Sequence, residues 1–167
     1  MQYYSLNKQS PPVDFRTATI TGQAPDKGLY FPVEIPTLDA ATIERFKTLS
    51  KADLAFEVMR PYVGGTIDDI SLKQICAETI DFDFPLVTIS ETISALELFH
   101  GPTLAFKDVG ARFMSRCLGY FSKQTKLLEK ENGTTSELKT TTVLVATSGD
   151  TGGAVASGFL GVDGVNV

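Results

Sequence analysis

The chain has 167 residues, of which 43% are apolar and 21% are charged, a balance typical of soluble globular proteins. This length normally makes one domain and is enough to bury a hydrophobic core. The formal charge of −5 argues against a general nucleic-acid binder, because no basic stripe offsets the acidity. No apolar run approaches the roughly 18 residues that span a bilayer, and the amino terminus lacks a hydrophobic signal core. We therefore expect a cytoplasmic protein with no membrane partner.

One histidine and two distant cysteines exclude a structural zinc site of the usual kind, and we expect no metal. Cys76 and Cys117 lie in apolar helical stretches and are expected to be reduced core residues. Only His100 could act as the base of a Ser-His-Asp or Cys-His arrangement. Because Gly101-Pro102 follows it, we favour a role in stabilising a turn or lining a site.

The amino-terminal region, residues 1–85, is expected to be mostly helical. Residues 1–36 contain repeated prolines and glycines, which predict turns and short strands around one small helix. Within them, Ala24–Pro32 is expected to be a rigid turn followed by a three-residue apolar plug, Leu29 to Phe31.

Three further helices are predicted. The first runs from Asp39 to about Leu49, with Ile43 and Phe46 on its inner face. Ser50 is expected to cap the second, and Gly64-Gly65 to end it. A capping box at Ser71–Gln74 is expected to open the third, whose apolar face carries Leu72, Ile75, Cys76 and Ile80.

Residues 86–167 follow an α/β pattern. Strands are predicted at about 86–89 and 93–99, and a helix follows Lys107. The polar residues 129–140 are expected to form an exposed, mobile loop. The β-branched run 141–146 is typical of a buried parallel strand, and it leads through a glycine turn into a helix of small residues at 154–160.

A further strand begins at Val165–Val167. The order of strand, glycine turn, helix and strand predicts an incomplete parallel sheet with flanking helices. Half a strand cannot close a parallel sheet, so we expect the chain to be a fragment of a longer polypeptide.

Lys107 stands between a turn and an amphipathic helix in the segment Thr103-Leu-Ala-Phe-Lys-Asp-Val-Gly110. A lysine amine held partly desolvated and neutral can form a Schiff base with an aldehyde such as pyridoxal phosphate (PLP). Lysine is also a poor complement to the positive end of a helix dipole, so another interaction is expected to hold it there. The local sequence pattern leaves an alternative open, in which Lys107 is a solvated lysine in the first turn of an ordinary helix.

The second motif is the glycine turn after the 141–146 strand, Thr147-Ser-Gly-Asp-Thr-Gly-Gly153. A strand, a glycine turn and a helix N-terminus form a general anion cradle, because free backbone N–H groups point at the ligand. The competing interpretation makes Asp150 or Thr151 a simple N-cap. The turn lacks the Gly-Lys-[Ser/Thr] ending of a Walker A loop and the spacing of a dinucleotide fingerprint. Together, a lysine suited to an imine and a cradle for a carboxylate indicate a PLP enzyme acting on amino acids.

The segments that contain these two motifs resemble those of the threonine synthase family. The matching segments are Leu96–Gly110, Ala146–Gly152 and Asp26–Pro32, although the family is expected to have glycine more often at the position of Lys27. The resemblance runs over essentially the whole chain. It implies a fold type II, tryptophan-synthase-β-like PLP enzyme, a lyase of threonine biosynthesis that converts O-phospho-L-homoserine and water to L-threonine and phosphate. Residues 86–167 would be the start of its PLP-binding α/β domains.

The resemblance also implies roles for single residues. Lys107 would be the Schiff-base lysine and would move protons at Cα and Cβ of the substrate. The loop of Thr147, Ser148, Gly149, Asp150 and Thr151 would bind the substrate carboxylate, and Asp150 would approach the 3′-hydroxyl of PLP. Relatives in the wider fold type carry Asn in this turn. A carboxylate beside a phenolate is unfavourable, so we expect the 3′-hydroxyl to keep its proton more often.

The family's loop for the PLP phosphate and its partner for the pyridine nitrogen lie beyond Val167, and the remainder of the polypeptide is therefore an expected partner. We expect the isolated chain to bind PLP weakly or not at all and to have no turnover. Three alternatives remain at this stage: a threonine-synthase-like phospho-lyase, a serine/threonine dehydratase, or a non-catalytic folding or interaction fragment. The sequence does not define the oligomeric state.

Overall fold

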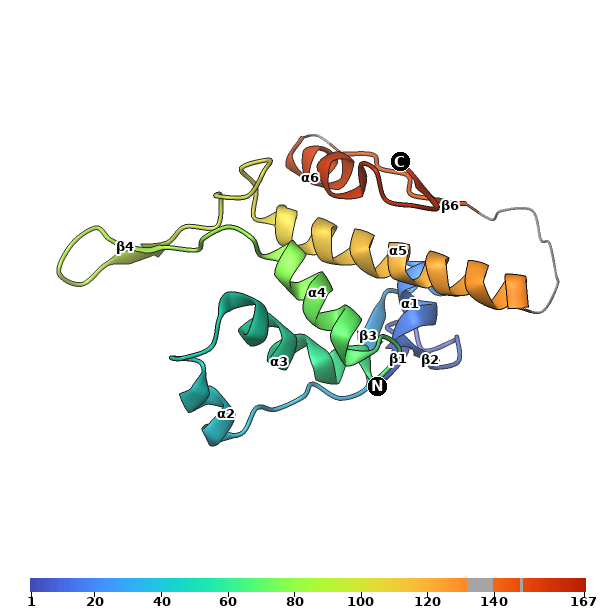
Figure 1. The fold of residues 1–167 in the computed structure, drawn as a ribbon, viewed down its shortest axis with the longest axis horizontal. Helices are drawn as coiled ribbons and strands as arrows, with labels where there is room; N and C mark the ends of the chain where they lie inside the picture. The colour runs from blue at the N-terminus through green and yellow to red at the C-terminus, as the bar shows by residue number, and fades with distance from the viewer. Residues whose placement is uncertain (132–139, 148) are drawn as a thin grey trace. The chain divides into compact units, whose positions relative to one another are not determined.

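The computed structural model describes residues 1–131, 140–147 and 149–167 (Figure 1). Within these ranges the chain divides into two compact units, Met1–Glu78 and Thr79–Val167. None of the helices in the described ranges is long and apolar enough to cross a membrane.

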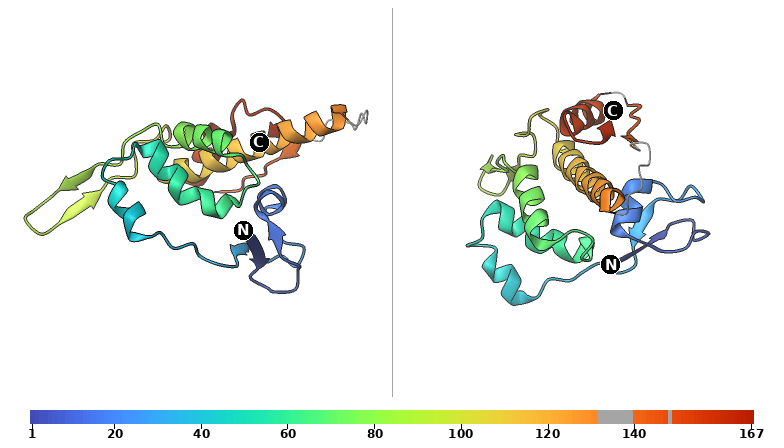
Figure 2. Two further views of the ribbon diagram at one scale, coloured as in Figure 1. Left: turned by 60° about the horizontal axis from the view of Figure 1, so that its bottom comes forward. Right: turned by 45° about the vertical axis from the view of Figure 1, so that its right-hand side comes forward.

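The first unit begins with a three-stranded antiparallel sheet. Strand β1 (Gln2–Ser5) lies between β2 (Val13–Asp14) and β3 (Tyr30–Pro32). Helix α1 (Phe15–Thr21) follows β2 directly, and the Asp14 carboxylate caps it by accepting the Thr17 N–H at 2.8 Å. Figure 2 shows α1 beside this small sheet. The expected short strands around one small helix are confirmed.

The turn before β3 is organised by the Asp26 carboxylate. Its oxygens accept the Ser5 hydroxyl at 2.6 Å and the backbone N–H groups of Gln9 and Gly28 at 2.9 Å each. The bond from Ser5, with the backbone donors, holds the pKa of Asp26 at about 2 because each of them favours the charged form. Lys27, between Asp26 and Gly28, has φ +66°, in the left-handed region that favours glycine.

The prediction that Leu29 to Phe31 form an apolar plug is wrong. Tyr30–Pro32 instead pair with β1 as an outer strand of the three-stranded sheet. Alternate side chains of a strand point to opposite faces of the sheet, and Leu29 and Phe31 remain 62% and 41% exposed.

Three helices complete the first unit: α2 (Ala40–Arg45), α3 (Lys51–Val63) and α4 (Asp69–Thr79), whose last residue begins the second unit. Both predicted ends of α3 are confirmed. Ser50 Oγ accepts the Asp53 N–H at the start of α3, and Gly64, with φ +61°, ends that helix. Helix α2 begins after the Asp39 cap as expected but ends at Arg45.

Two details of the predicted helices are wrong. The Ser71–Gln74 capping box does not open α4, because Asp68 Oδ1 accepts the Ser71 N–H at 2.9 Å and the helix begins at Asp69. Ile43 is 51% exposed rather than on an inner face. Three of the four residues predicted for the apolar face of this helix are confirmed: Leu72, Ile75 and Cys76 are buried, whereas Ile80 is half-buried and follows the last residue of α4. Burial raises the pKa of the free Cys76 thiol to about 11.

The second unit begins with an antiparallel hairpin of β4 (Leu86–Thr88) and β5 (Ser94–Leu96). The long helix α5 (Lys107–Glu131) follows it. Strand β6 (Thr141–Thr142), helix α6 (Asp150–Phe159) and strand β7 (Val165–Asn166) then form a β–α–β unit whose two strands are parallel. This confirms the expected crossover. Cys117 on α5 is buried and free, also as expected.

The strand expected over 141–146 is shorter and less buried than predicted. Only Thr141–Thr142 pair with β7, and Leu144 is 91% exposed, because the described sheet has two strands and neither face is deeply covered. Helix α5 continues to Glu131, two residues past the start of the loop expected at 129–140. Residues 132–139 of that loop lie outside the described residues.

We expect Lys27→Gly to stabilise the protein. A non-glycine residue in the left-handed region costs about 1–2 kcal/mol, and the greater freedom of glycine in the unfolded chain offsets about half of the gain. The free energy of unfolding, measured by urea titration, should therefore rise by about 0.5–1 kcal/mol. Lys123→Gly, in the interior of α5, is the control and should lower it by about 1 kcal/mol. A destabilised Lys27→Gly variant would contradict the prediction.

Candidate active site

Lys107 is the first residue of α5 and follows a tight turn. The Leu104 N–H donates to the Gly101 carbonyl oxygen at 3.0 Å, and the Asp108 N–H donates to the Ala105 carbonyl oxygen at 3.0 Å. Leu104 has φ +58°, a conformation that an L-residue rarely adopts. The half-buried Lys107 places its Nζ 5.3 Å from the centre of the Phe106 ring, within cation–π distance.

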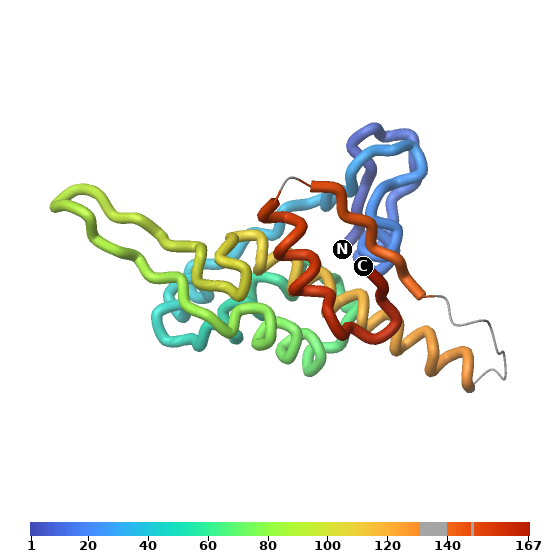
Figure 3. Tube along the Cα trace, turned by 90° about the horizontal axis from the view of Figure 1, so that it is seen from above, coloured from blue at the N-terminus to red at the C-terminus, as the bar shows by residue number. Residues whose placement is uncertain are grey.

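Helices α5 and α6 pack against each other through a glycine (Figure 3). Gly158 is buried, and a Cβ added there would lie 3.1 Å from the Ala111 carbonyl carbon and 3.2 Å from the Arg112 nitrogen. These neighbours are backbone atoms of α5 and cannot rotate away. The absence of a side chain at position 158 therefore allows the two helices to approach closely.

Helix α6 begins directly after the glycine turn. Its N-cap residue is Gly149, which has no side chain to accept the N–H groups of the first turn, and the Gly153 N–H bonds to the Gly149 carbonyl oxygen at 3.1 Å. The first N–H groups of a helix have no acceptor within the helix and carry the positive end of its dipole. The alternative in which Asp150 or Thr151 caps this helix is wrong, because the helix begins at Asp150.

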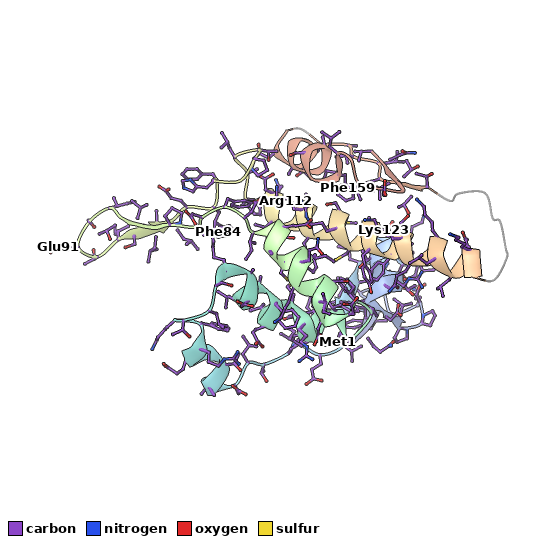
Figure 4. The ribbon with its side chains drawn as sticks, in the orientation of Figure 1. Met1, Phe84, Glu91, Arg112, Lys123 and Phe159 are labelled. Atoms are coloured by element: carbon purple, nitrogen blue, oxygen red, sulfur yellow. The ribbon has the colours of Figure 1, made fainter. Side chains whose placement is uncertain are left out.

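One cavity of about 490 Å³ lies between the first turns of α5 and α6. Both Lys107 and Thr151 line it, so the structure brings together one residue of each sequence motif. The rest of the lining is almost entirely apolar: Phe106, Val109, Gly110, Ala111, Met114, Val143, Ala154, Val155 and Phe159. Figure 4 labels Phe159 on α6 and Arg112 on α5, the two helices that supply most of the lining.

The other predicted site residues that the structure describes lie at the turn but do not line this cavity. Gly149 and Asp150 are exposed. Thr147 is also exposed, and its Cγ2 lies 2.7 Å from where a Cβ on Gly152 would be. Ser148 is outside the described residues.

His100 takes part in a local interaction and does not line the cavity. Its Nε2 lies 2.6 Å from Glu97 Oε2, and its ring stacks on Phe99 with 4.8 Å between ring centres. This arrangement agrees with a role in stabilising the turn.

Sequence reasoning missed two contributors to the site. Phe159 lines the cavity although no motif includes it, since its position depends on the α5–α6 packing. Asp108 follows Lys107 directly and is 1% exposed, yet no role was predicted for it. The available signal was a carboxylate in the first turn of a helix, preceded by a Gly-Pro-Thr turn.

Comparison with known proteins agrees with this geometry. The threonine synthase structure from yeast superimposes with a TM-score of 0.86 at 38% identity, covering 98% of this chain and 34% of that one. The PLP-bound threonine synthase from Brucella melitensis gives 0.81 at 35% identity, covering 99% and 34%. The fold is therefore that of the α/β, fold type II class of PLP enzymes.

The sequence comparisons identify which fold type II PLP enzymes this chain resembles. Residues 2–80 match the family described as "Threonine synthase N terminus". The threonine synthase of Buchnera aphidicola, subspecies Acyrthosiphon pisum, is 36% identical over 168 residues, covering 100% of this chain. Residues 2–80 of this chain thus belong to the amino-terminal domain family of threonine synthases, and the whole chain is similar to threonine synthases. It spans 36% of the length of the first curated relatives that it matches.

We expect two glycines of α6 to respond oppositely to alanine. Gly158→Ala forces the added methyl group into the α5 backbone and should cost about 1–3 kcal/mol of unfolding free energy. Gly153→Ala places its methyl group 4.0 Å from Thr103 Cβ, an ordinary contact, and should stabilise by about 0.5–1 kcal/mol through helix propensity. Thermal unfolding of both variants checks the pair. Equal effects would show that α5 and α6 do not approach closely at Gly158.

Proposed function

We propose that this chain forms the amino-terminal part of a PLP-dependent threonine synthase, which converts O-phospho-L-homoserine and water to L-threonine and phosphate. The observation that carries the proposal is the cavity that Lys107 and Thr151 share, because it joins the amine and the anion-binding turn in one place. The similarity to threonine synthases supports the reaction, and the PLP-bound state of the Brucella enzyme supports the cofactor.

The residues around Lys107 fit PLP. A cavity of about 490 Å³ lies within the range of roughly 300–1,000 Å³ usual for small-molecule sites. Its walls are apolar, as a planar aromatic ring requires, and its one cationic side chain is a primary amine that can bond to an aldehyde. When bound, PLP supplies an electron sink that stabilises negative charge on the adjacent substrate carbon.

Lys107 has two tasks in this proposal. Its amine would hold the cofactor covalently and, when free, would accept and return protons at Cα and Cβ of the substrate. The apolar walls serve both tasks, because they surround the amine and would hold it next to the reacting atoms. The walls also limit water near the reacting carbons, which protects a reactive substrate from side reactions.

The glycine turn orients the substrate. The N–H groups at the start of α6, with the hydroxyl groups of Thr147, Ser148 and Thr151, would bind the substrate carboxylate. Gly149 leaves those N–H groups without a capping side chain, which supports this use. Asp150 would face the 3′-hydroxyl of PLP. The phosphate of the cofactor and the pyridine nitrogen would be held by the remainder of the polypeptide, and residues 86–167 would form the first part of the PLP-binding domains.

We expect Lys107→Ala to abolish threonine formation in the full-length enzyme. Loss of a proton-transferring side chain should lower kcat by at least about 10³-fold. Lys123→Ala, on an exposed part of α5, is the matched control and should keep wild-type activity. The assay follows threonine, phosphate and 2-oxobutyrate from O-phospho-L-homoserine. Formation of 2-oxobutyrate without threonine in the wild type would indicate the phospho-lyase, and full activity of Lys107→Ala would refute the proposal.

Asp150→Asn should change the titration of bound PLP. A carboxylate next to the 3′-oxygen disfavours its ionised form, so removal of the charge should lower the pKa of the cofactor. The visible absorption of the full-length holoenzyme, titrated with pH, should therefore change at a lower pH in Asp150→Asn. Asp163→Asn, in the exposed loop after α6, is the control for loss of charge. An unmoved titration in Asp150→Asn would contradict the assigned place of Asp150.

A further inference from the structure

Asp108 is a buried carboxylate that the proposed chemistry does not use. It is 1% exposed, although it lies directly after the half-buried Lys107 in the first turn of α5. Its Oδ2 accepts the Thr103 backbone N–H at 2.9 Å, and its Oδ1 accepts the Thr103 hydroxyl at 2.6 Å. Both oxygens therefore point back to the turn that precedes Lys107, and a burial this complete requires such partners.

The Asp108 carboxylate closes the turn through its two hydrogen bonds to Thr103. Between its two ends lie Leu104, in the rarely adopted conformation of φ +58°, and Ala105, whose carbonyl oxygen accepts the Asp108 N–H. A turn with a residue in this conformation persists only where surrounding contacts fix it. The two bonds to Thr103 supply such contacts, and the negative charge also suits the N-terminal end of a helix.

The absence of a side chain at Gly101 leaves room for the Asp108 carboxylate. A Cβ added at Gly101 would lie 2.5 Å from Asp108 Oδ2, 2.9 Å from its Cβ and 3.0 Å from its Cγ. Any larger residue at position 101 must therefore displace the Asp108 side chain. This contact is independent of the hydrogen bonds, so Gly101→Ala perturbs the carboxylate without changing its chemistry.

Thr103 also lies next to the second motif. A Cβ at Gly153, in the first turns of α6, would be 4.0 Å from Thr103 Cβ, within van der Waals contact. The partner of Asp108 therefore stands between the lysine turn and the helix that follows the glycine turn.

We infer that Asp108 is a positioning residue for Lys107: through Thr103, it fixes the turn that sets the Lys107 amine in the cavity. The role of Lys107 itself rests on the proposed function, but the effect of Asp108 on the amine does not require it. Asp108 points away from the cavity and acts on the reacting groups only through the turn.

The test measures the reactivity of the Lys107 amine without PLP. The full-length protein, free of PLP, is labelled with trace acetic anhydride at several pH values, and mass spectrometry gives the ratio of acetylated Lys107 to acetylated Lys123. Lys123 is exposed on the same helix and serves as the internal reference. The variants are Asp108→Asn, Gly101→Ala, Thr103→Val and Thr103→Ser.

Release of the turn should expose the amine. We expect the labelling ratio to rise about fivefold in Asp108→Asn, Gly101→Ala and Thr103→Val, the factor that loss of one net hydrogen bond gives to a local opening. Thr103→Ser keeps both donors and should stay close to wild type. Asp14→Ala removes a helix-capping carboxylate in the other unit and controls for general loss of stability.

An unchanged ratio in Asp108→Asn and Gly101→Ala would overturn the inference, as would an equal rise in Asp14→Ala. If Asp108→Asn fails to fold, the comparison of Thr103→Val with Thr103→Ser decides. A separate experiment separates this inference from the proposed function: wild-type holoenzyme is reduced with borohydride and the PLP-modified lysine is mapped. PLP attached to a lysine other than Lys107 would refute the proposed function. The acetylation ratio would still show whether the Asp108–Thr103 hydrogen bonds position the Lys107 amine.

Discussion

The geometry of the candidate site depends on the close packing of α6 on α5 at Gly158. Backbone atoms of Ala111 and Arg112 fill the space where a side chain of residue 158 would stand. The separation of the two helices is therefore set by van der Waals contact with backbone atoms and not with flexible side chains. Lys107 begins one helix and Thr151 lies in the first turn of the other, so the distance between the two motifs follows from this contact. The apolar residues that line the cavity then come from the facing surfaces of the same two helices.

A second constraint acts on the ends of these helices. Both candidate motifs lie at or next to a helix N-terminus, where the first backbone N–H groups have no acceptor within the helix. On α5 the turn is closed by the buried carboxylate of Asp108, and on α6 it is left open by Gly149. The carboxylate in the first turn of α5 is thus bonded to the preceding turn, whereas the start of α6 has no side-chain cap, as a site for an outside anion requires.

Local features could be predicted from the sequence, and contacts between distant residues could not. The Ser50 cap, the Gly64 stop and the buried face of α4 depend on residues three or four positions apart, and all are confirmed. The predicted start of α4 is wrong because Asp68 accepts the Ser71 N–H. The helix therefore begins before Ser71, which cannot serve as its N-cap. The two motifs were found because their residue types are specific. Their shared cavity, the Phe159 wall and the Thr103–Asp108 bonds arise only from tertiary packing, which periodicity does not encode.

The β4–β5 hairpin has a consequence for handling this chain in solution. Leu86, Ile89, Ile93 and Leu96 are each more than half exposed, and the described sheet contains only these two strands. A ribbon with apolar faces and unpaired backbone edges is a template for pairing with other chains. Glu91, labelled near the turn of the hairpin in Figure 4, places a charge at its tip, where like charges on two copies repel each other. Colloidal stability of the isolated chain therefore depends on ionic strength, because salt screens that repulsion and leaves the apolar attraction in place.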